Sequence, residues 1–306
     1  VPVLATGYTV SDDGKQMIIG TYTSNVNNDL HHLDLTTGKW TTFTKDKSDV
    51  IYGSITLLPD NKTIWLVCND NPEGMSRLAK MTLGSPKVTF VSDGWLDPKW
   101  ECEGVGFSRD YKYMAGSTNE DCWGRMKVRE VATGKEVKLP KLDGFLNVAG
   151  FVETGELILS FSSPTKAPDV YRWNPQTEQL TQLTQSMYAG IDPKLFRDPV
   201  LVRMPSFDGL EISGFLYLPA SYEEGKPVPF IVEAHGGPES QFRPGFIRNF
   251  QYMMLNGYGI LALNPRGSSG YGREFLAMDN YKKRKDSLKD YKAATDWLIA
   301  QGYTEK

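Results

Sequence analysis

Residues 230–240 read FIVEAHGGPES and open the stretch that decides the fold, which closes with GILALNPRGSSGYG at residues 259–272. The apolar run at 230–232 is typical of a parallel strand that is buried on both faces. His235-Gly236-Gly237-Pro238 breaks this strand, and two adjacent glycines let the backbone turn sharply and point N–H groups at a ligand. Backbone donors at the end of a strand suit an oxyanion, because they need no reorganisation as charge develops. The alternative is an ordinary connection between a strand and a helix.

Helices are predicted on either side of the second apolar run at 259–264. Residues 246–256 place Phe246, Phe250, Met253 and Met254 on one helical face, and Gly257 follows as the residue that ends the helix. Residues 287–301 form a second periodic segment, in which Ser287 and Asp290 have the spacing of a capping box.

Strands precede these helices as well. Two β runs, 200–203 and 210–218, flank the hairpin-type turn at 206–209. Strands that alternate with helices at this spacing predict a mostly parallel sheet with helices on both faces.

The overall composition excludes several classes of protein. At 306 residues the chain exceeds what one hydrophobic core usually serves, so two domains are expected. A formal net charge of −3 gives no basic footprint for nucleic acid, and no apolar run is long enough to span a bilayer. We therefore expect neither a nucleic-acid partner nor a membrane partner.

The three cysteines do not predict a disulfide framework. Cys68, Cys102 and Cys122 are odd in number and read as small core residues, with a Cys102–Cys122 bridge as the alternative. No cluster of Cys and His has the spacing of metal ligands, so we expect no metal site and no cofactor.

The first 190 residues repeat with a period of about 45 residues. A polar turn that precedes an apolar strand recurs at 13–15, 60–62, 110–112 and 154–156, and a second turn recurs at 37–39, 85–87, 133–135 and 176–178. Each unit holds four short strands, which is the size of a β-propeller blade. We predict about four blades that form part of a larger propeller; a small closed propeller and a β-sandwich are the alternatives.

Two carboxylates lie where one predicted blade passes to the next. Glu101 and Glu103 flank Cys102 in the sequence. A carboxylate pair that faces a propeller channel can hold the amino terminus of a substrate. The alternative is a pair of solvated loop charges.

Three motifs together resemble one family. HGGPES at 235–240, NPRGSSGYG at 264–272 and DWLIAQGY at 296–303 make residues from about 200 to 306 similar to the opening half of the α/β-hydrolase domain of the prolyl oligopeptidase family of serine peptidases. Its members place a seven- or eight-bladed propeller in front of that domain. The HGGP form of the first motif resembles the acylaminoacyl-peptidase branch more than dipeptidyl peptidase IV or prolyl oligopeptidase itself.

The resemblance implies a peptidase that cleaves short peptides with a Ser-His-Asp triad. It assigns one oxyanion donor to the backbone N–H of Gly237, while His235 and Gly236 shape the turn. Asn264, Arg266 and Gly267 match the second motif of the family and are interpreted as support for the floor of the active site. Arg266 is also a candidate for substrate binding, with a structural ion pair as the alternative.

The triad itself is absent from the sequence. The chain has no Gly-x-Ser-x-Gly elbow, and His235, the one histidine in this half, precedes the expected elbow. We therefore expect residues 1–190 to be propeller blades and residues 191–306 to be the first part of a hydrolase domain. The triad is expected beyond Lys306, on the remaining C-terminal part of the domain, so that this chain alone would be inactive and an internal piece of a longer protein.

Two other functions stay open at this point. The first is a carboxylesterase, since His-Gly-Gly turns also occur in lipases. The second is a propeller that serves as a binding module and carries a non-catalytic hydrolase remnant. The sequence also leaves open a homo-oligomer and the compartment, whether cytoplasmic, periplasmic or secreted.

Overall fold

The computed structural model describes residues 4–24, 26–44, 49–237 and 239–305. The chain divides into two compact units. The first comprises Val1–Glu120 and Arg125–Leu139, and the second comprises Asp121–Gly124 and Pro140–Lys306. Each unit is described by itself below.

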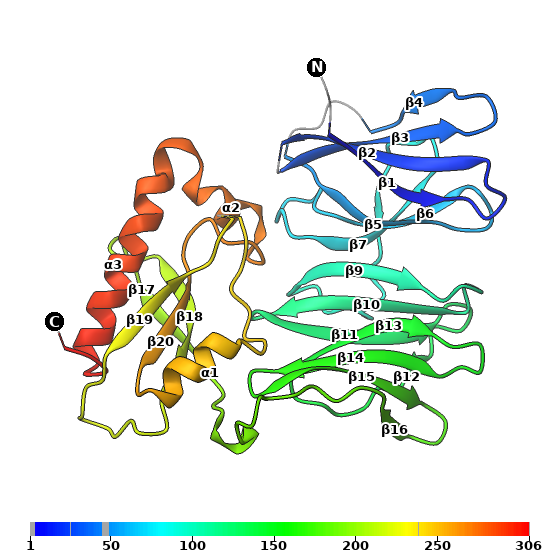
Figure 1. Ribbon diagram of the computed structural model, residues 1–306. Helices are drawn as coiled ribbons and strands as arrows, with labels where there is room; N and C mark the ends of the chain where they lie inside the picture. Colours follow the sequence, from blue (N-terminus) through cyan, green and yellow to red (C-terminus); the bar gives the residue numbers. More distant parts are fainter. Residues whose placement is uncertain (1–3, 25, 45–48, 238, 306) are drawn as a thin grey trace. The chain divides into compact units, whose positions relative to one another are not determined.

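Four four-stranded sheets follow one another along the chain, each with its strands side by side in chain order (Figure 1). The first sheet holds β1 (Leu4–Val10), β2 (Gln16–Ser24), β3 (Asn27–Asp34) and β4 (Trp40–Thr42), and the second holds β5 (Tyr52–Leu57), β6 (Thr63–Cys68), β7 (Arg77–Thr82) and β8 (Thr89–Phe90). The third holds β9 (Glu101–Phe107), β10 (Tyr113–Glu120), β11 (Trp123–Glu130) and β12 (Glu136–Val137), and the fourth holds β13 (Phe145–Phe151), β14 (Leu157–Ser163), β15 (Lys166–Asn174) and β16 (Gln179–Gln182). The predicted unit of four strands per repeat is confirmed.

The recurring turns connect the first strand of each sheet to the second. The middle residue of every turn has a positive φ: 68° at Gly14, 55° at Asn61, 58° at Tyr111 and 85° at Gly155. In three of the turns an aspartate side chain accepts a hydrogen bond from the backbone N–H two residues later, as Asp60 does from Lys62 at 2.9 Å. Glycine and asparagine tolerate this conformation best, which is why the turns are visible in the sequence.

Successive sheets of the first unit pack face to face. On β6, Ile64 and Leu66 lie in a core cluster with Ile18 and Leu30 of the first sheet. The alternate residues Trp65 and Val67 of β6 lie in a second cluster with residues of the third sheet, among them Cys102, Val105 and Met114. Because neighbouring side chains on a strand point to opposite faces, the second sheet is buried between the first and the third.

The first strands of these three sheets also lie next to each other. β1 contacts β5, and β5 contacts β9. The Ser54 hydroxyl accepts from the Val105 N–H at 2.8 Å and donates to the Val105 carbonyl at 3.0 Å. One serine side chain therefore bridges the first strands of the second and third sheets.

A mixed sheet and its helices follow the four sheets. The strand order is β17 (Val200–Pro205), β18 (Glu211–Tyr217), β20 (Gly259–Asn264) and β19 (Phe230–Ala234). β19 and β20 are parallel, whereas the other two pairs are antiparallel. The prediction of a mostly parallel sheet is therefore wrong for these strands. The hairpin of β17 and β18 forces one antiparallel pair, and only the crossover from β19 to β20 gives a parallel one.

The two apolar runs of the deciding stretch occupy different places in this sheet. β20 is central, and all six of its residues are buried. β19 lies at the edge of the described sheet, where its residues are half-buried and Ala234 is exposed. The expectation that residues 230–232 are buried on both faces is therefore wrong among the described residues, because β19 pairs there with β20 alone.

Helices cover both faces of the mixed sheet, as predicted (Figure 1). α1 (Arg248–Leu255) buries Phe250 and Met254 against Phe215, Tyr217 and Ile260. α3 (Arg284–Ala300) buries Ala294 and Leu298 against the opposite face, where Leu261 and Leu263 of β20 lie. The shorter helices are η1 (Pro193–Leu195), α2 (Gly272–Leu276), η2 (Ala277–Asp279) and η3 (Tyr281–Lys283).

The predictions for the helix ends hold at the C-termini of the two long helices but not at the N-terminus of α3. Gly257 and Gly302 follow α1 and α3 with φ of 85° and 75°, as a left-handed terminating residue requires. The capping box predicted for Ser287 and Asp290 is wrong, because α3 begins three residues earlier, at Arg284. Asp290 is fully buried, and its carboxylate binds Arg266 instead.

The cysteines and the surface fit the composition. None of the three cysteines forms a disulfide, and all three are buried. No helix of the described chain is long and apolar enough to cross a membrane.

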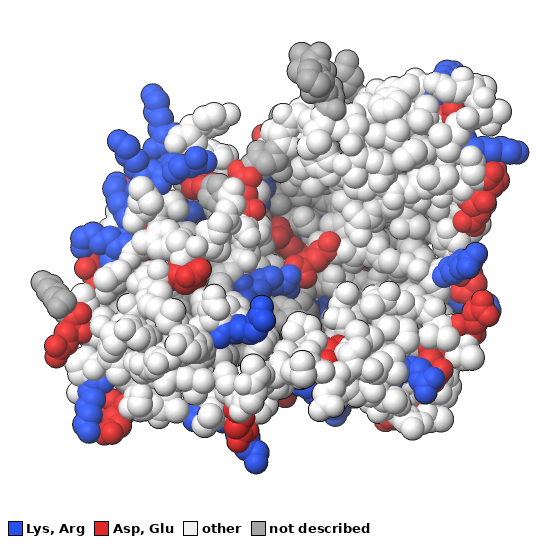
Figure 2. Space-filling model, in the orientation of Figure 1, with Lys and Arg blue, Asp and Glu red and all other residues white. Residues whose placement is uncertain are grey.

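Basic side chains gather over the start of α3 (Figure 2), where Lys282, Lys283, Arg284 and Lys285 are consecutive and exposed.

Truncation of Leu298 tests the packing of α3 on the sheet. Leu298 has no exposed surface. We expect Leu298→Ala to lower the free energy of unfolding by about 2–5 kcal/mol, because it opens a cavity in a close-packed cluster. Leu288→Ala on the same helix is the control, since Leu288 is 66% exposed and its truncation should change stability by less than about 0.5 kcal/mol. Urea denaturation measures both, and equal losses would contradict the packing.

Candidate active site

The predicted oxyanion turn begins where β19 ends. Gly237 has a φ of 135°, which side chains rarely adopt, and a Cβ there would lie 3.0 Å from the backbone N of Glu239. A Cβ at Gly236, in contrast, would meet no atom within 4 Å. Both glycines are exposed, and no described residue accepts a hydrogen bond from the Gly237 N–H. Gly237 therefore presents a backbone donor in a conformation that only glycine takes without strain. Pro238 lies outside the described residues.

His235 connects this turn to the second glycine-rich turn. Its Nε2 lies 3.0 Å from the Oγ of Ser268, which has no exposed surface. Ser268 Oγ in turn donates to the Pro265 carbonyl at 2.6 Å. A backbone hydrogen bond from Ser269 N–H to the Ser240 carbonyl, 2.9 Å long, joins the same two turns. The two motifs that the sequence analysis singled out thus contact each other directly.

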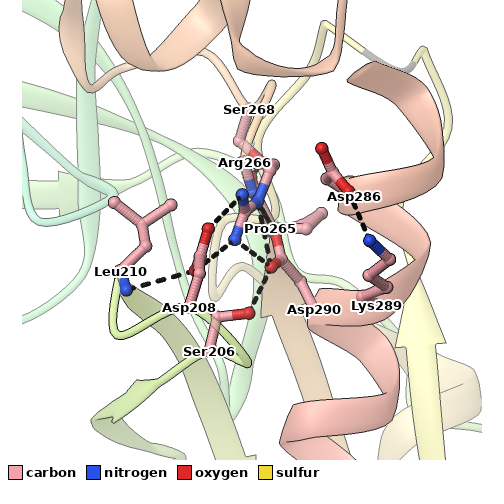
Figure 3. A network of polar contacts seen from close by, with 9 residues as sticks. All are labelled: Ser206, Asp208, Leu210, Pro265, Arg266, Ser268, Asp286, Lys289 and Asp290. Atoms are coloured by element: carbon pink, nitrogen blue, oxygen red, sulfur yellow. Dashed lines mark hydrogen bonds and ion pairs between the residues drawn. The ribbon is translucent and has the colours of Figure 1, made fainter. Parts of the chain in front are cut away.

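An ion-pair network holds the second turn in place (Figure 3). The Arg266 guanidinium binds both carboxylate oxygens of Asp208 at 2.8 Å, and its Nε lies 3.0 and 3.1 Å from the two oxygens of Asp290. The backbone N–H of Arg266 also donates to Asp290, at 2.9 Å. Asp208 belongs to the turn between β17 and β18, and Asp290 belongs to α3. Three separate elements therefore meet at one side chain.

The electrostatics of this network follow from burial and pairing. Arg266 is 7% exposed and Asp290 has no exposed surface. The hydrogen bonds from Arg266 lower the pKa of the Asp208 carboxyl to about 2, and the same bonds raise the pKa of the Arg266 guanidinium. The Ser206 hydroxyl also donates to Asp290 Oδ1, the oxygen that lies 3.1 Å from Arg266 Nε. These contacts agree with the structural alternative for Arg266; a role in substrate binding stays a prediction.

Gly267 and Asn264, the other residues of the second motif, have structural partners too. Gly267 has a φ of 92°, and the carboxyl group of the buried Asp279 occupies the place where a Cβ would stand. Burial raises the pKa of that Asp279 carboxyl. The Asn264 amide accepts from the Phe242 N–H at 2.7 Å and donates to the Phe242 carbonyl at 3.2 Å. Asn264 therefore fixes the segment that follows the predicted oxyanion turn, and its role as support for an active site stays a prediction.

Three other kinds of functional group remain to be placed: a cysteine nucleophile, a metal site and the pair of glutamates on β9. Burial raises the pKa of the Cys122 thiol to about 11, which argues against its use as a nucleophile. Among the described residues no group of three or more His, Cys, Asp or Glu side chains is arranged to hold a metal ion. Glu101 and Glu103 both lie on β9, whose register with β10 shifts between Cys102 and Gly104, and Glu103 is exposed. Their role in binding a substrate amine stays a prediction.

Comparisons with known proteins agree with these motifs. A model of the prolyl oligopeptidase family matches residues 244–306. The uncharacterized peptidase YuxL of Bacillus subtilis (strain 168) is 32% identical over 124 residues, which cover 39% of this chain and 18% of that protein. Dipeptidyl aminopeptidase BIII of Pseudoxanthomonas mexicana is 33% identical over 156 residues, which cover 46% of this chain and 22% of that protein. Residues 244–306 are therefore similar to the prolyl oligopeptidase family.

A solved structure extends the likeness to the whole chain. The crystal structure of a puromycin hydrolase matches with a TM-score of 0.79 and 18% identity, over 98% of this chain and 47% of the other. At that identity the match shows a shared fold, including the four sheets that precede the mixed sheet. The matched part spans less than half the length of that hydrolase and of the two relatives above.

Sequence reasoning missed four residues of this site. Ser206, Asp208 and Asp290 complete the shell of Arg266, and Ser268 connects Arg266's turn to His235. Asp290 was assigned to a helix cap, and Asp208 to a hairpin turn, because each fits a local pattern. The signal that pointed toward Ser268 was its place directly after the glycine of the second motif.

Removal of Asp290 tests the network. We expect Asp290→Ala to lower the free energy of unfolding by about 3–5 kcal/mol, because Arg266 would keep a buried charge with one partner lost. Asp286→Ala is the matched control on the same helix. Asp286 pairs with Lys289 at 2.7 Å at a solvated position (Figure 3), and such pairs contribute about 0–1 kcal/mol. Urea denaturation of both variants measures the difference, and similar losses would show that the Arg266 network is not a major stabilising contact.

Proposed function

We propose that the whole protein is a serine peptidase that hydrolyses short peptides. The observation that carries the proposal is the exposed Gly237 N–H at the end of β19, in a family whose named members include peptidases. In acyl transfer, negative charge develops on the carbonyl oxygen as the nucleophile attacks. A preorganised backbone donor stabilises that oxygen more than the substrate carbonyl and so lowers the barrier. Gly237 is assigned this role.

The Ser, Asp and His of the triad are assigned to a part of the protein outside this sequence. Two observations support this assignment. The sequence holds no Gly-x-Ser-x-Gly elbow. The ring of His235 faces Ser268 and the Gly236 carbonyl, within its own turn and the neighbouring one. His235 and Gly236 are therefore assigned to shaping the oxyanion turn.

We infer that the four sheets are blades of a larger β-propeller. The face-to-face packing of the first three sheets and the adjacency of β1, β5 and β9 support this, since the first strands of propeller blades line a common channel. Under this proposal residues 1–190 belong to the propeller and residues 191–306 to the hydrolase domain. The His-Gly-Gly-Pro form of the turn favours a specificity like that of acylaminoacyl-peptidases.

A fluorophosphonate probe tests the proposed function on the full-length protein. The probe phosphonylates an activated serine, so labelling that is blocked by prior heat denaturation supports a serine hydrolase. An N-acetylated peptide anilide should then be cleaved with a higher kcat/KM than a p-nitrophenyl ester. Folded full-length protein that does not label would favour the binding module, and a preference for the ester would favour the carboxylesterase.

Replacement of Gly237 tests its assigned role. We expect Gly237→Ala in the full-length protein to lower kcat by about 10²–10³-fold with little change in KM, because a side chain is strained at a φ of 135° and its Cβ would crowd the Glu239 backbone N, which moves the Gly237 N–H away from the oxyanion. Gly245→Ala is the control: a Cβ at Gly245 meets nothing within 4 Å, so kcat should stay within about twofold. Steady-state kinetics on the peptide anilide measures both, and an unchanged kcat in Gly237→Ala would remove Gly237 from the mechanism.

A further inference from the structure

We propose that Ser268 is a positioning residue, whose buried hydroxyl accepts a hydrogen bond from a protonated Nε2 of His235 and thereby holds the turn that presents the Gly237 N–H. The part that concerns catalysis rests on the proposed function. The part that concerns the protonation of Nε2 rests on the described contacts alone.

The hydrogen bonds of Ser268 fix the direction of its contact with His235. A serine hydroxyl has one proton to donate and two lone pairs that accept. Ser268 Oγ lies 2.6 Å from the Pro265 carbonyl oxygen, which can only accept, so the hydroxyl proton is used there. In the contact of 3.0 Å with His235, Ser268 must therefore accept, and His235 must donate from Nε2. The Nε2 atom of His235 is thus protonated and cannot act as a general base. The Nδ1 atom lies 3.2 Å from the Gly236 carbonyl oxygen, which also can only accept, so the contact with Ser268 fixes the proton on Nε2 whether or not Nδ1 carries one as well.

Ser268 can fix the position of His235 because several hydrogen bonds fix its own position. It has no exposed surface, and its backbone N–H donates to the Pro265 carbonyl as its hydroxyl does. The preceding residues are anchored by Arg266 on Asp290 and by the 3.0 Å bond from the Gly267 N–H to the Phe275 carbonyl. The second turn is therefore a rigid base beside the exposed first turn.

Gly237 lies between the two attachments to this base. His235 binds Ser268 on its N-terminal side, and the Ser240 carbonyl accepts from the Ser269 N–H on its C-terminal side. The intervening glycines are exposed and have no side chains that could fix them. Small displacements of a reacting or stabilising group have large effects on rate, so the His235 attachment matters for the donor at Gly237.

A double-mutant cycle on the full-length protein tests the catalytic part. Ser268→Ala should lower kcat for the peptide anilide about tenfold with KM within about twofold. His235→Ala should do the same, and the double variant should be no slower than His235→Ala alone, because both remove one contact. Ser287→Ala on α3 is the control for the substitution and should leave kcat unchanged. A structural defect at Ser268 would instead give effects that multiply.

The outcomes separate this proposal from the proposed function. Multiplying effects, or an unchanged kcat in Ser268→Ala, would overturn the positioning role while fluorophosphonate labelling of the unaltered protein still supports a hydrolase. If the unaltered protein does not label with the fluorophosphonate, the protonation of the His235 ring tests the contact with Ser268 independently of catalysis. In protein labelled with ¹⁵N-histidine, the resonance that His235→Asn removes should show a protonated Nε2 in the unaltered protein and a changed ring shift in Ser268→Ala. A ring protonated at Nδ1 alone would overturn the proposal.

Discussion

The pairing of the buried Arg266 guanidinium with two carboxylates is the constraint on which the rest of the site depends. A buried charge is tolerated only when it is paired and hydrogen-bonded, so Arg266 requires both Asp208 and Asp290 to be in place. One carboxylate comes from the hairpin of β17 and β18 and the other from α3. The turn after β20 can therefore take its shape only when the hairpin and the helix have both docked on the sheet.

Burial decreases from the Arg266 network to the turn that carries the candidate oxyanion donor. β20 is buried throughout and delivers the turn that contains Arg266, Gly267 and Ser268. β19 is half-buried at the edge of the described sheet and delivers the exposed turn that contains Gly237. The link between His235 and Ser268 connects the exposed turn to the buried one. A backbone donor gains from this arrangement, because it must be accessible to a substrate and yet fixed in direction.

Local features of this fold could be predicted from the sequence, and distant pairings could not. The hairpin turns were visible because Gly14, Asn61 and Gly155 answer a local need for positive φ, and the faces of α1 followed from helical spacing. Asp290 was misassigned because its partner Arg266 is 24 residues away and a nearer serine fitted a capping pattern. The edge position of β19 was missed because strand order depends on pairing across the sheet. Ser268 could be located only by its place in a motif, since His235, the residue that its hydroxyl contacts from another turn, is 33 residues away in the sequence.

The most direct test of the central claim is an experimental structure of the full-length protein after reaction with a fluorophosphonate. We expect the phosphoryl oxygen to lie about 2.7–3.1 Å from the backbone N of Gly237. His235 should still contact Ser268 in that structure, and Arg266 should still bind Asp208 and Asp290. A phosphoryl oxygen held by other donors, with the Gly237 N–H directed away from it, would show that Gly237 is not an oxyanion donor.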